Sequence, residues 1–314
     1  MPTLRKPCGT AERHARGEES AVSDPVLLRS GQVQAVISPI GAELTGLTHD
    51  AFGELLWSGD PRWWARQSPL LFPVVGKCAG DRIRVGDQEF PMPLHGFAHA
   101  MTFDVVATEI HRCRLVLTDG PATQVHYPFP FRLEVDYALD GAALRIEARI
   151  INTGGGILPA SFGFHPGFRW PLADGLPKTA HRLVFDADNH LDVARAKEGL
   201  ILPGTTRFDL SNGALPLDEA LFADGAMVMH APRSRRVRFL ADGSPFAVSL
   251  AWRNLPSLGL WMRPGADFLC IEPWAGHGDL AGFAGDFRDK PGVIAIAAGA
   301  TAGFGMDLSV DAIE

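Results

Sequence analysis

Short extended runs, each interrupted by Gly, Pro, Asp or Asn, constrain the fold of this chain more than any other feature of its sequence. Apolar and polar residues alternate within these runs, which is the pattern of half-buried β-strands. Turn signals such as Asp140-Gly141 and Asp242-Gly243 separate neighbouring runs, as hairpins require. Strands are predicted at residues 33–37, 102–108, 115–118, 131–139, 144–151, 183–185, 226–230, 237–240, 246–252, 258–262, 268–272 and 293–297.

Helical periodicity is nearly absent, and only residues 60–65 and 217–222 predict a turn or two of helix. Parallel strand–helix units of the kind that bind nucleotides are therefore not expected. Many antiparallel strands without internal repeats predict an all-β fold, one large antiparallel β-sandwich with few short helices. We expect residues 26–314 to form this single domain and residues 1–25, which lack apolar periodicity, to form a flexible N-terminal extension.

Composition and charge limit the classes of partner that are expected. The formal net charge of −7 over 314 residues argues against nucleic acid, because phosphate binding requires a clustered positive field. No apolar run is long enough to span a membrane, so no membrane partner is expected. The cysteines are scattered, with no CxxC pair and no secretory leader, which predicts reduced thiols and a cytoplasmic location. They are Cys8, Cys78, Cys113 and Cys270.

The stretch PASFGFHPGF, near the middle of the chain, combines an alternating strand with a histidine at its end. Phe162 and Phe164 are predicted on one face of this strand, and Gly163 and His165 on the other. Pro166 has no N–H to donate and should end the ladder. His165 would then lie at the lip of the strand, beside a glycine that lets a ligand approach the backbone. An ordinary core histidine also fits this stretch.

The run Phe268–Glu272 is predicted as a second strand of this kind, with Cys270 and Glu272 on one face and Pro273 at its end. A carboxylate at the end of an apolar run, beside Trp274, should be partly desolvated. Desolvation raises the carboxyl pKa, which makes a better base near neutral pH. A glutamate that reaches water or pairs with an arginine is the alternative.

Two further histidines, His95 and His99, follow a pair of prolines. Gly96 predicts irregular backbone at His95, whose imidazole would then face a cleft. A spacing of four residues suits a metal only on a helix, and the prolines and Gly96 argue against a helix here. No metal site is predicted.

Basic residues and tryptophans complete the candidate set. Arg82 and Arg84 are predicted to share one face of a strand, which is typical of a solvated surface, and a ligand-facing Arg82 is the alternative. Among seven tryptophans, those such as Trp64 and Trp274 would offer flat apolar platforms to a sugar ring, unless they belong to the core. Acidic and basic groups without a nucleophile motif suit proton transfer on a polar small molecule.

Four motifs, in this order and spacing, resemble the aldose 1-epimerase (galactose mutarotase-like) family, and within it the bacterial LacX-like branch. The likeness covers about residues 30–310. It implies a galactose mutarotase-like supersandwich with the sugar lying across an open cleft. The motifs are Leu71–Lys77, Leu94–Ala98, Ser161–Phe168 and Cys270–Trp274.

The resemblance implies an isomerase that interconverts the anomers of a free aldose without a metal or organic cofactor, as a monomer or homodimer. His165 would be the general acid that protonates the ring oxygen, and Glu272 the base that removes the proton of the anomeric hydroxyl. His95 would polarise the sugar close to its ring oxygen. The residues expected to bind the substrate are Arg82, Lys77, His99, Trp274 and Trp64.

The chain departs from the family pattern at three positions. Lys77 stands where the family usually has arginine, and Phe164 precedes His165 where the branch usually has glycine. His99 replaces an arginine that the resemblance assigns to phosphate binding in hexose-6-phosphate epimerases.

Two alternatives to a free aldose as substrate therefore stay open. One is a hexose-6-phosphate 1-epimerase, and the other is a non-catalytic sugar-binding protein on the same fold. An additional acidic substrate ligand would be Asp218 or Asp224. A basic pocket for a phosphate would come from Lys77, Arg82, Arg84 and Arg66.

Overall fold

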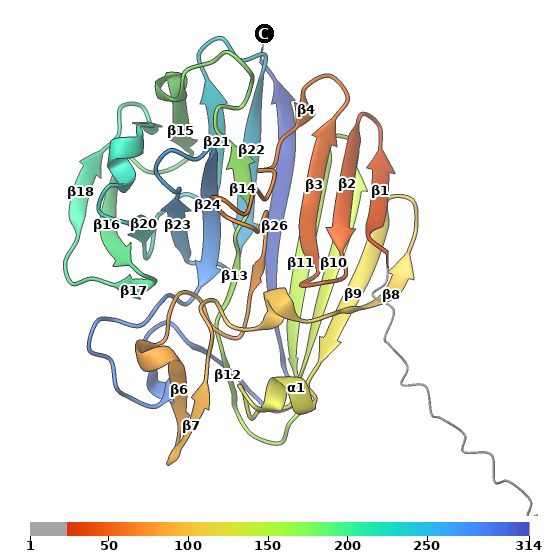
Figure 1. Cartoon of the computed structure of the whole chain (residues 1–314), viewed down its shortest axis with the longest axis vertical. Coiled ribbons are helices and arrows are strands. Elements are labelled where there is room, and N and C mark those ends of the chain that lie inside the picture. Colours follow the sequence, from red (N-terminus) through yellow and green to blue (C-terminus); the bar gives the residue numbers. More distant parts are fainter. Residues whose placement is uncertain (1–23, 314) are drawn as a thin grey trace, which may run out of the picture.

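A computed structural model describes residues 24–313, and two large antiparallel sheets that pack against each other dominate it (Figure 1). The first large sheet has the strand order β19-β15-β21-β22-β26-β11-β10-β9-β8. Its strands are β8 (Asp104–Thr108), β9 (Arg112–Thr118), β10 (Phe131–Asp140), β11 (Ala143–Asn152), β15 (His181–Phe185), β19 (Ala214–Pro216), β21 (Arg236–Ala241), β22 (Phe246–Arg253) and β26 (Thr301–Ala312).

The second large sheet follows the order β17-β16-β20-β23-β24-β13-β5, with β14 also paired to β24 and β18 to β16. Its strands are β5 (Leu70–Leu71), β13 (Phe162–Phe164), β14 (Gly167–Arg169), β16 (His190–Lys197), β17 (Leu200–Ile201), β18 (Thr206–Asp209), β20 (Ala226–Met229), β23 (Ser257–Trp261) and β24 (Phe268–Ala275).

Three small sheets and a few helical turns complete the described residues. The small sheets are formed by β1 (Val26–Ser30), β2 (Val33–Ser38), β3 (Glu43–His49) and β4 (Gly53–Glu54); by β6 (Arg82–Val85) and β7 (Gln88–Pro91); and by β12 (Leu158–Ala160) and β25 (Ile294–Ile296). The helical turns are α1 (Pro121–Gln124) and 3-10 turns at Ala79–Asp81, Ala98–Ala100, Lys178–Ala180, Glu219–Phe222 and Phe287–Asp289.

This architecture confirms the all-β prediction. Both turn signals join hairpins, since β10 pairs with β11 and β21 pairs with β22. The predicted helical turn at 217–222 is present as the 3-10 turn Glu219–Phe222, whereas residues 60–65 form turns without a helix.

The expectation that Pro273 ends its strand is wrong. β24 continues through Pro273 to Ala275, and Pro273 pairs with Leu258 of β23. On its other side, β24 pairs with β13 at Trp274 and Ala275. Pro273 has no paired residue in β13, so its missing N–H does not interrupt that ladder. Pro166, in contrast, does lie in a break, between β13 and β14.

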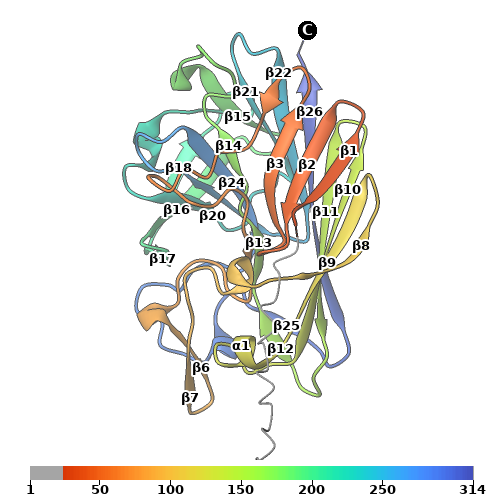
Figure 2. The same cartoon turned by 45° about the vertical axis from the view of Figure 1, so that its right-hand side comes forward.

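The hydrophobic core lies between the two large sheets. Phe162 of β13 stacks on Phe304 of β26, with ring centroids 5.0 Å apart. The four-stranded sheet β1–β4 lies alongside the first large sheet (Figure 2). Tyr137 of β10 anchors it there, because its buried hydroxyl donates to the carbonyl of Ala42 at 2.6 Å. Strands β13 and β24 of the second sheet are buried on both faces.

Other sequence expectations concern the ends and cysteines of the chain. The predicted extension, residues 1–25, lies outside the described residues except for its last two. Within residues 24–313, no helix combines the length and apolar character that a membrane span needs. Cys78, Cys113 and Cys270 are all buried free thiols, and Cys8 lies outside the described part of the chain.

Candidate active site

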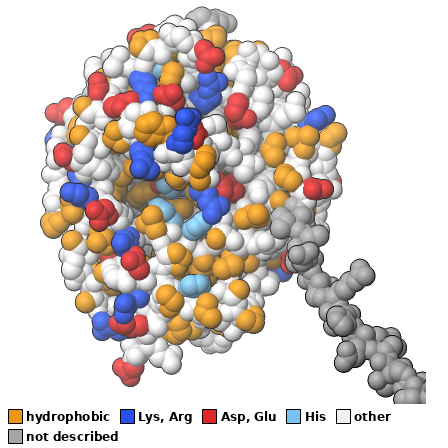
Figure 3. Space-filling view, in the orientation of Figure 1, with side chains coloured by type: hydrophobic (Ala, Val, Ile, Leu, Met, Phe, Trp, Pro, Cys, Tyr) orange, Lys and Arg blue, Asp and Glu red, His pale blue; other side chains and the backbone are white. Residues whose placement is uncertain are grey.

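A cavity of about 680 Å³ opens on the face of the second sheet that points away from the core. Figure 3 shows a hollow on this side of the molecule, with histidine and hydrophobic side chains inside it and charged side chains around it. The cavity brings together residues that are far apart in the sequence. Its lining includes Trp64, Arg66, Leu94, His95, His99, His165, Lys197, Glu198, Trp261, Glu272 and Trp274.

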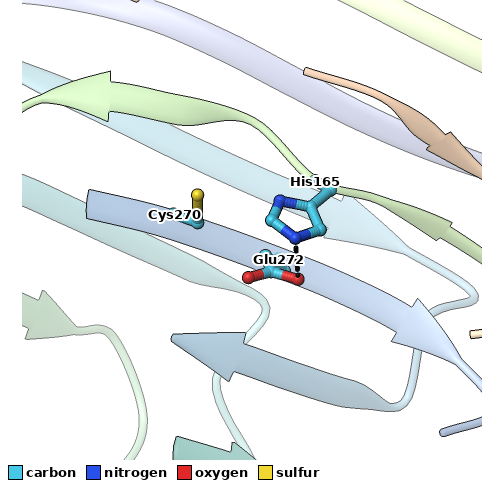
Figure 4. Close-up of side chains that lie close together, drawn as sticks. All are labelled: His165, Cys270 and Glu272. Atoms are coloured by element: carbon cyan, nitrogen blue, oxygen red, sulfur yellow. Dashed lines mark ion pairs between the residues drawn. The ribbon is translucent and has the colours of Figure 1, made fainter. Parts of the chain in front are cut away.

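His165 and Glu272 meet on the floor of this cavity. Nε2 of His165 lies 3.1 Å from Oε2 of Glu272, and both side chains are almost fully buried (Figure 4). β24 holds Glu272 in its regular ladder, whereas His165 follows the last residue of β13 and precedes Pro166. The strand break predicted from Pro166 thus frees the imidazole to face the carboxyl group of Glu272 on β24.

Burial sets the protonation of this pair. It raises the pKa of the Glu272 carboxyl well above its ordinary value, and it lowers the pKa of the His165 imidazole well below its own. The nearby Trp274 indole opposes the rise in the Glu272 pKa in part, although its Nε1 makes no hydrogen bond of ordinary geometry. Burial therefore favours the uncharged form of each group, in which the pair holds a single acidic proton on the Glu272 carboxyl.

His95 is held as a neutral hydrogen-bond donor. Its backbone is left-handed, with φ at +64°, and its Nδ1 accepts from the N–H of Gly76 at 3.1 Å. Burial lowers the pKa of His95 to about 3, so the ring is neutral and its proton lies on Nε2. Gly96 makes this turn possible, because a Cβ there would lie 2.2 Å from the carbonyl oxygen of Phe72. The irregular backbone expected at His95 is confirmed.

Aromatic rings hold the imidazole of His165 in place. The ring of Trp64 lies 4.9 Å from it in a tilted arrangement, and the ring of Trp261 lies 5.9 Å away, edge-on. His95 approaches edge-on at 5.3 Å. These rings also give the cavity flat apolar walls of the kind that suit the C–H face of a sugar.

Trp274 lies across the sheet because two glycines leave room beneath it. A Cβ on Gly163 of β13 would lie 2.6 Å from Trp274 Cδ1, and a Cβ on Gly259 of β23 would lie 2.5 Å from Cζ2 and Cη2. At Gly167 a Cβ would lie 2.8 Å from Cζ3 of Trp64. The space beside Gly163 that was expected to admit a ligand is therefore filled by the indole of Trp274.

Arg66 and His99 form a polar corner of the cavity. Nη1 of Arg66 donates to the backbone carbonyl of His99 at 2.9 Å and lies 3.3 Å from Oε2 of the buried Glu43. Burial, reinforced by the Arg66 charge, lowers the pKa of His99 to about 4. This corner thus carries one positive charge, on Arg66, beside a neutral imidazole.

The structure does not bring all the expected binding residues to this cavity. Arg82 lies on the exposed β6–β7 hairpin, where its Nη1 lies 2.7 Å from Oε2 of Glu89. Nζ of Lys77 points to Asp81 at 3.4 Å and its backbone N–H donates to the carbonyl of Gly199, but Lys77 does not line the cavity. Arg82 therefore lies on a solvated surface, as is typical of two arginines on one strand face, and its expected contact with a ligand in this cavity is not seen.

Most of the other acidic and basic candidates also lie outside the cavity. Asp218 caps the 3-10 turn Glu219–Phe222 by accepting from the N–H of Ala220 at 2.7 Å. Neither Asp218 nor Asp224 lines the cavity. Of the four residues considered for a basic pocket, Arg66 is the one that lines it.

The sequence did not mark Lys197 and Glu198 as site candidates, and Trp261 was considered only as one of seven tryptophans that could form a platform for a sugar ring. Trp261 had a detectable signal, because alternation along residues 258–262 puts it on the same face as Gly259. Lys197 and Glu198 end β16 and begin the turn that follows, and no sequence pattern marks them.

One set of side chains could hold a metal ion. Ligand atoms of His165, Cys270 and Glu272 lie within 4.8 Å of one another. The sequence spacing raised only His95 and His99 as metal ligands, and Nδ1 of His95 accepts a hydrogen bond from the N–H of Gly76.

Comparison with known proteins places this chain in a family. Residues 24–287 match the model of the aldose 1-epimerase family. Protein LacX (plasmid) of Lactococcus lactis subsp. lactis is 27% identical over 278 residues, which cover 85% of this chain and 92% of that protein.

Solved structures agree with this match. A galactose mutarotase related enzyme from Lactobacillus acidophilus superposes with a TM-score of 0.86 at 24% identity, over 93% of this chain and 100% of the other. A galactose mutarotase-like protein from Lactobacillus casei gives a TM-score of 0.84 at 25% identity, over 91% of this chain and 100% of the other. The chain belongs to the aldose 1-epimerase family.

Proposed function

We propose that this protein is an aldose 1-epimerase that interconverts the α and β anomers of a free aldose by opening and closing the sugar ring. The observation that carries the proposal is the 3.1 Å contact between Nε2 of His165 and Oε2 of Glu272 on the floor of the cavity. Ring opening takes a proton from the anomeric hydroxyl and gives one to the ring oxygen. Both oxygens are bonded to C1, so the base that acts on one and the acid that acts on the other must lie close together, as Glu272 and His165 do.

The pair works with the single proton that it holds. In the active form Glu272 is a carboxylate and His165 an imidazolium, which have the same total number of protons as the neutral pair. Glu272 accepts the proton of the O1 hydroxyl while His165 donates its proton to O5. The C1–O5 bond breaks, C1 becomes an aldehyde, and rotation about C1–C2 presents its other face. Ring closure reverses both transfers and restores the pair without an outside proton donor.

The remaining lining residues position the sugar. The neutral Nε2–H of His95 supplies a hydrogen bond to a ring or hydroxyl oxygen, since its Nδ1 is already engaged by Gly76. Trp64 and Trp261 offer apolar faces to the ring, and Trp274 forms the adjoining wall. The exclusion of water by this buried floor strengthens the hydrogen bonds made during proton transfer.

The test is anomer exchange measured by NMR magnetisation transfer or polarimetry on α-D-glucose and α-D-galactose. Wild-type protein should accelerate exchange, and Glu272→Gln, which keeps the volume of the side chain but loses the base, should slow it by about a thousandfold or more. His165→Asn should do the same. Unchanged exchange by a folded Glu272→Gln variant would refute the proposal.

A hexose 6-phosphate is the second candidate substrate, and Arg66 in the cavity favours it. Arg66 would place one cation near a phosphate, whereas Lys77 and Arg82 point elsewhere. The same assay on glucose 6-phosphate separates the two candidate substrates. If the phosphate is the true substrate, its kcat/KM should be much higher than that of the free sugar. Saturable sugar binding without faster exchange would instead indicate a binding protein.

A further inference from the structure

Cys270 is a buried thiol beside the proton-transfer pair that the proposed mechanism does not use. It precedes Glu272 by two residues on β24, so the two side chains share one face of the strand. Figure 4 shows its sulfur, the imidazole of His165 and the carboxyl of Glu272 grouped together. One ligand atom from each residue lies within 4.8 Å of the other two, and all three residues are buried.

This spacing suits a single small cation. Three atoms separated by at most 4.8 Å surround a point that is no more than about 2.8 Å from each of them. Zinc bonds nitrogen, oxygen and sulfur at about 2.0–2.3 Å, so the three side chains need to close by about 0.5–0.8 Å. Nδ1 of His165 makes no hydrogen bond to any described residue, so no such bond prevents a small rotation of the imidazole toward the ion.

The donor set selects the class of ion. An imidazole, a thiolate and a carboxylate form a mixed N, S and O set of the kind that zinc accepts, whereas Mg²⁺ and Ca²⁺ prefer oxygen alone. Binding replaces the thiol proton and the proton that His165 and Glu272 share, so two protons leave for each Zn²⁺ bound.

The fourth coordination position opens to the cavity, because His165 and Glu272 both line it. His95 does not complete the set, since its Nδ1 accepts from Gly76 and its Nε2 carries the proton. A three-ligand site of this kind keeps a position for water or a substrate oxygen. Here, however, the ion would occupy the two groups that carry the protons of the proposed reaction.

We infer that His165, Cys270 and Glu272 form a binding site for one Zn²⁺ ion, and that the bound ion excludes turnover of the sugar. The site would make the enzyme reversibly sensitive to free zinc through a thiol that is dispensable for proton transfer. The inhibition rests on the proposed function, whereas the binding of zinc does not.

Zinc binding is tested by titrating the full-length protein with Zn²⁺ in competition with a chromophoric chelator. Wild type should bind one ion, and Cys270→Ser should weaken the affinity by about tenfold or more, because it removes the thiolate ligand. Cys113→Ser is the matched control, because Cys113 is another buried free thiol but lies on β9 in the first sheet. It should bind zinc like wild type.

A second variant and a second readout guard against misfolding. Glu272→Gln should also weaken zinc binding, and circular dichroism reports whether each variant is folded. In the exchange assay, Zn²⁺ should inhibit wild type and a chelator should restore it, while Cys270→Ser should need about tenfold or more zinc for the same fractional inhibition.

Three outcomes would overturn the inference: no stoichiometric binding by wild type, equal affinity in Cys270→Ser, or an equal loss in Cys113→Ser. If wild type does not exchange anomers but the titration behaves as expected, the proposed function fails and the zinc site stands.

Discussion

Gly259→Ala tests whether the position of Trp274 governs the site. An added Cβ at residue 259 would lie 2.5 Å from Cζ2 and Cη2 of the indole, whereas ordinary contacts begin at 3.4 Å. The ring must therefore move by about 1 Å. Its other edge rests on Gly163, where a Cβ would lie at 2.6 Å, so the ring has no room to move toward the sheet there and must rise into the cavity.

Two effects of this movement are expected. Overpacking of a buried ring costs about 1–3 kcal/mol of stability, which thermal or urea unfolding will measure. A shift of about 1 Å in a wall of the active site lowers kcat/KM by about 10- to 100-fold, which the anomer-exchange assay will measure. The loss should exceed what the change in stability explains, because a folded protein with a raised indole has a smaller cavity beside Glu272.

Gly303→Ala is the matched control. Gly303 also lies within a strand, β26, but a Cβ there meets nothing within 4 Å. This variant should keep both stability and activity. Wild-type stability and wild-type kcat/KM in Gly259→Ala would refute the argument, since they would show that the indole does not depend on the glycine beneath it.

Three further predictions follow from the site and its surroundings. The pH–rate profile of exchange should show no inflection near the ordinary histidine pKa of about 6.5, because burial holds the pKa of His165 well below that value; an inflection there would contradict this. Arg66→Ala should raise KM in exchange kinetics and lower stability in urea unfolding by about 1–3 kcal/mol, because it leaves the buried Glu43 without its cation. Arg82→Ala, on the exposed hairpin, should change neither KM nor stability. Lys290→Met should cost about 3–5 kcal/mol in urea unfolding, because it leaves Asp279 buried without the ammonium group 2.8 Å away; a loss below about 1 kcal/mol would show that the pair is not desolvated.

Local sequence patterns determined most of the strand assignments. Alternation and turn residues act between neighbours in the chain, so the hairpin of β10 and β11 could be predicted within one or two residues at each end. The desolvation of Glu272 could be predicted in the same way, because an apolar run on both sides of a carboxylate makes its burial a local property. The strand break at Pro166 follows from the missing N–H of proline.

Tertiary structure decided the rest, because contacts across a sheet depend on register between distant segments. Two prolines that look alike in sequence differ in effect, since Pro273 lies where the neighbouring strand β13 supplies no further partner and Pro166 lies in a break. Arg82 and Arg66 are equally basic, yet the β6–β7 hairpin turns the first outward, and the pairing with Glu43 holds the second at the cavity.

The contact between His165 and Glu272 likewise depends in part on the local sequence and in part on the tertiary structure. Their residue types are written in the sequence, as is the position of His165 at the end of a strand, whereas Glu272 lies within β24 and not at its end. Their separation of 3.1 Å, the indole that fills the space over Gly163, and the thiol of Cys270 beside them arise only when β13, β14, β23 and β24 align. Local chemistry thus determined which groups can act, and long-range register determined which of them meet.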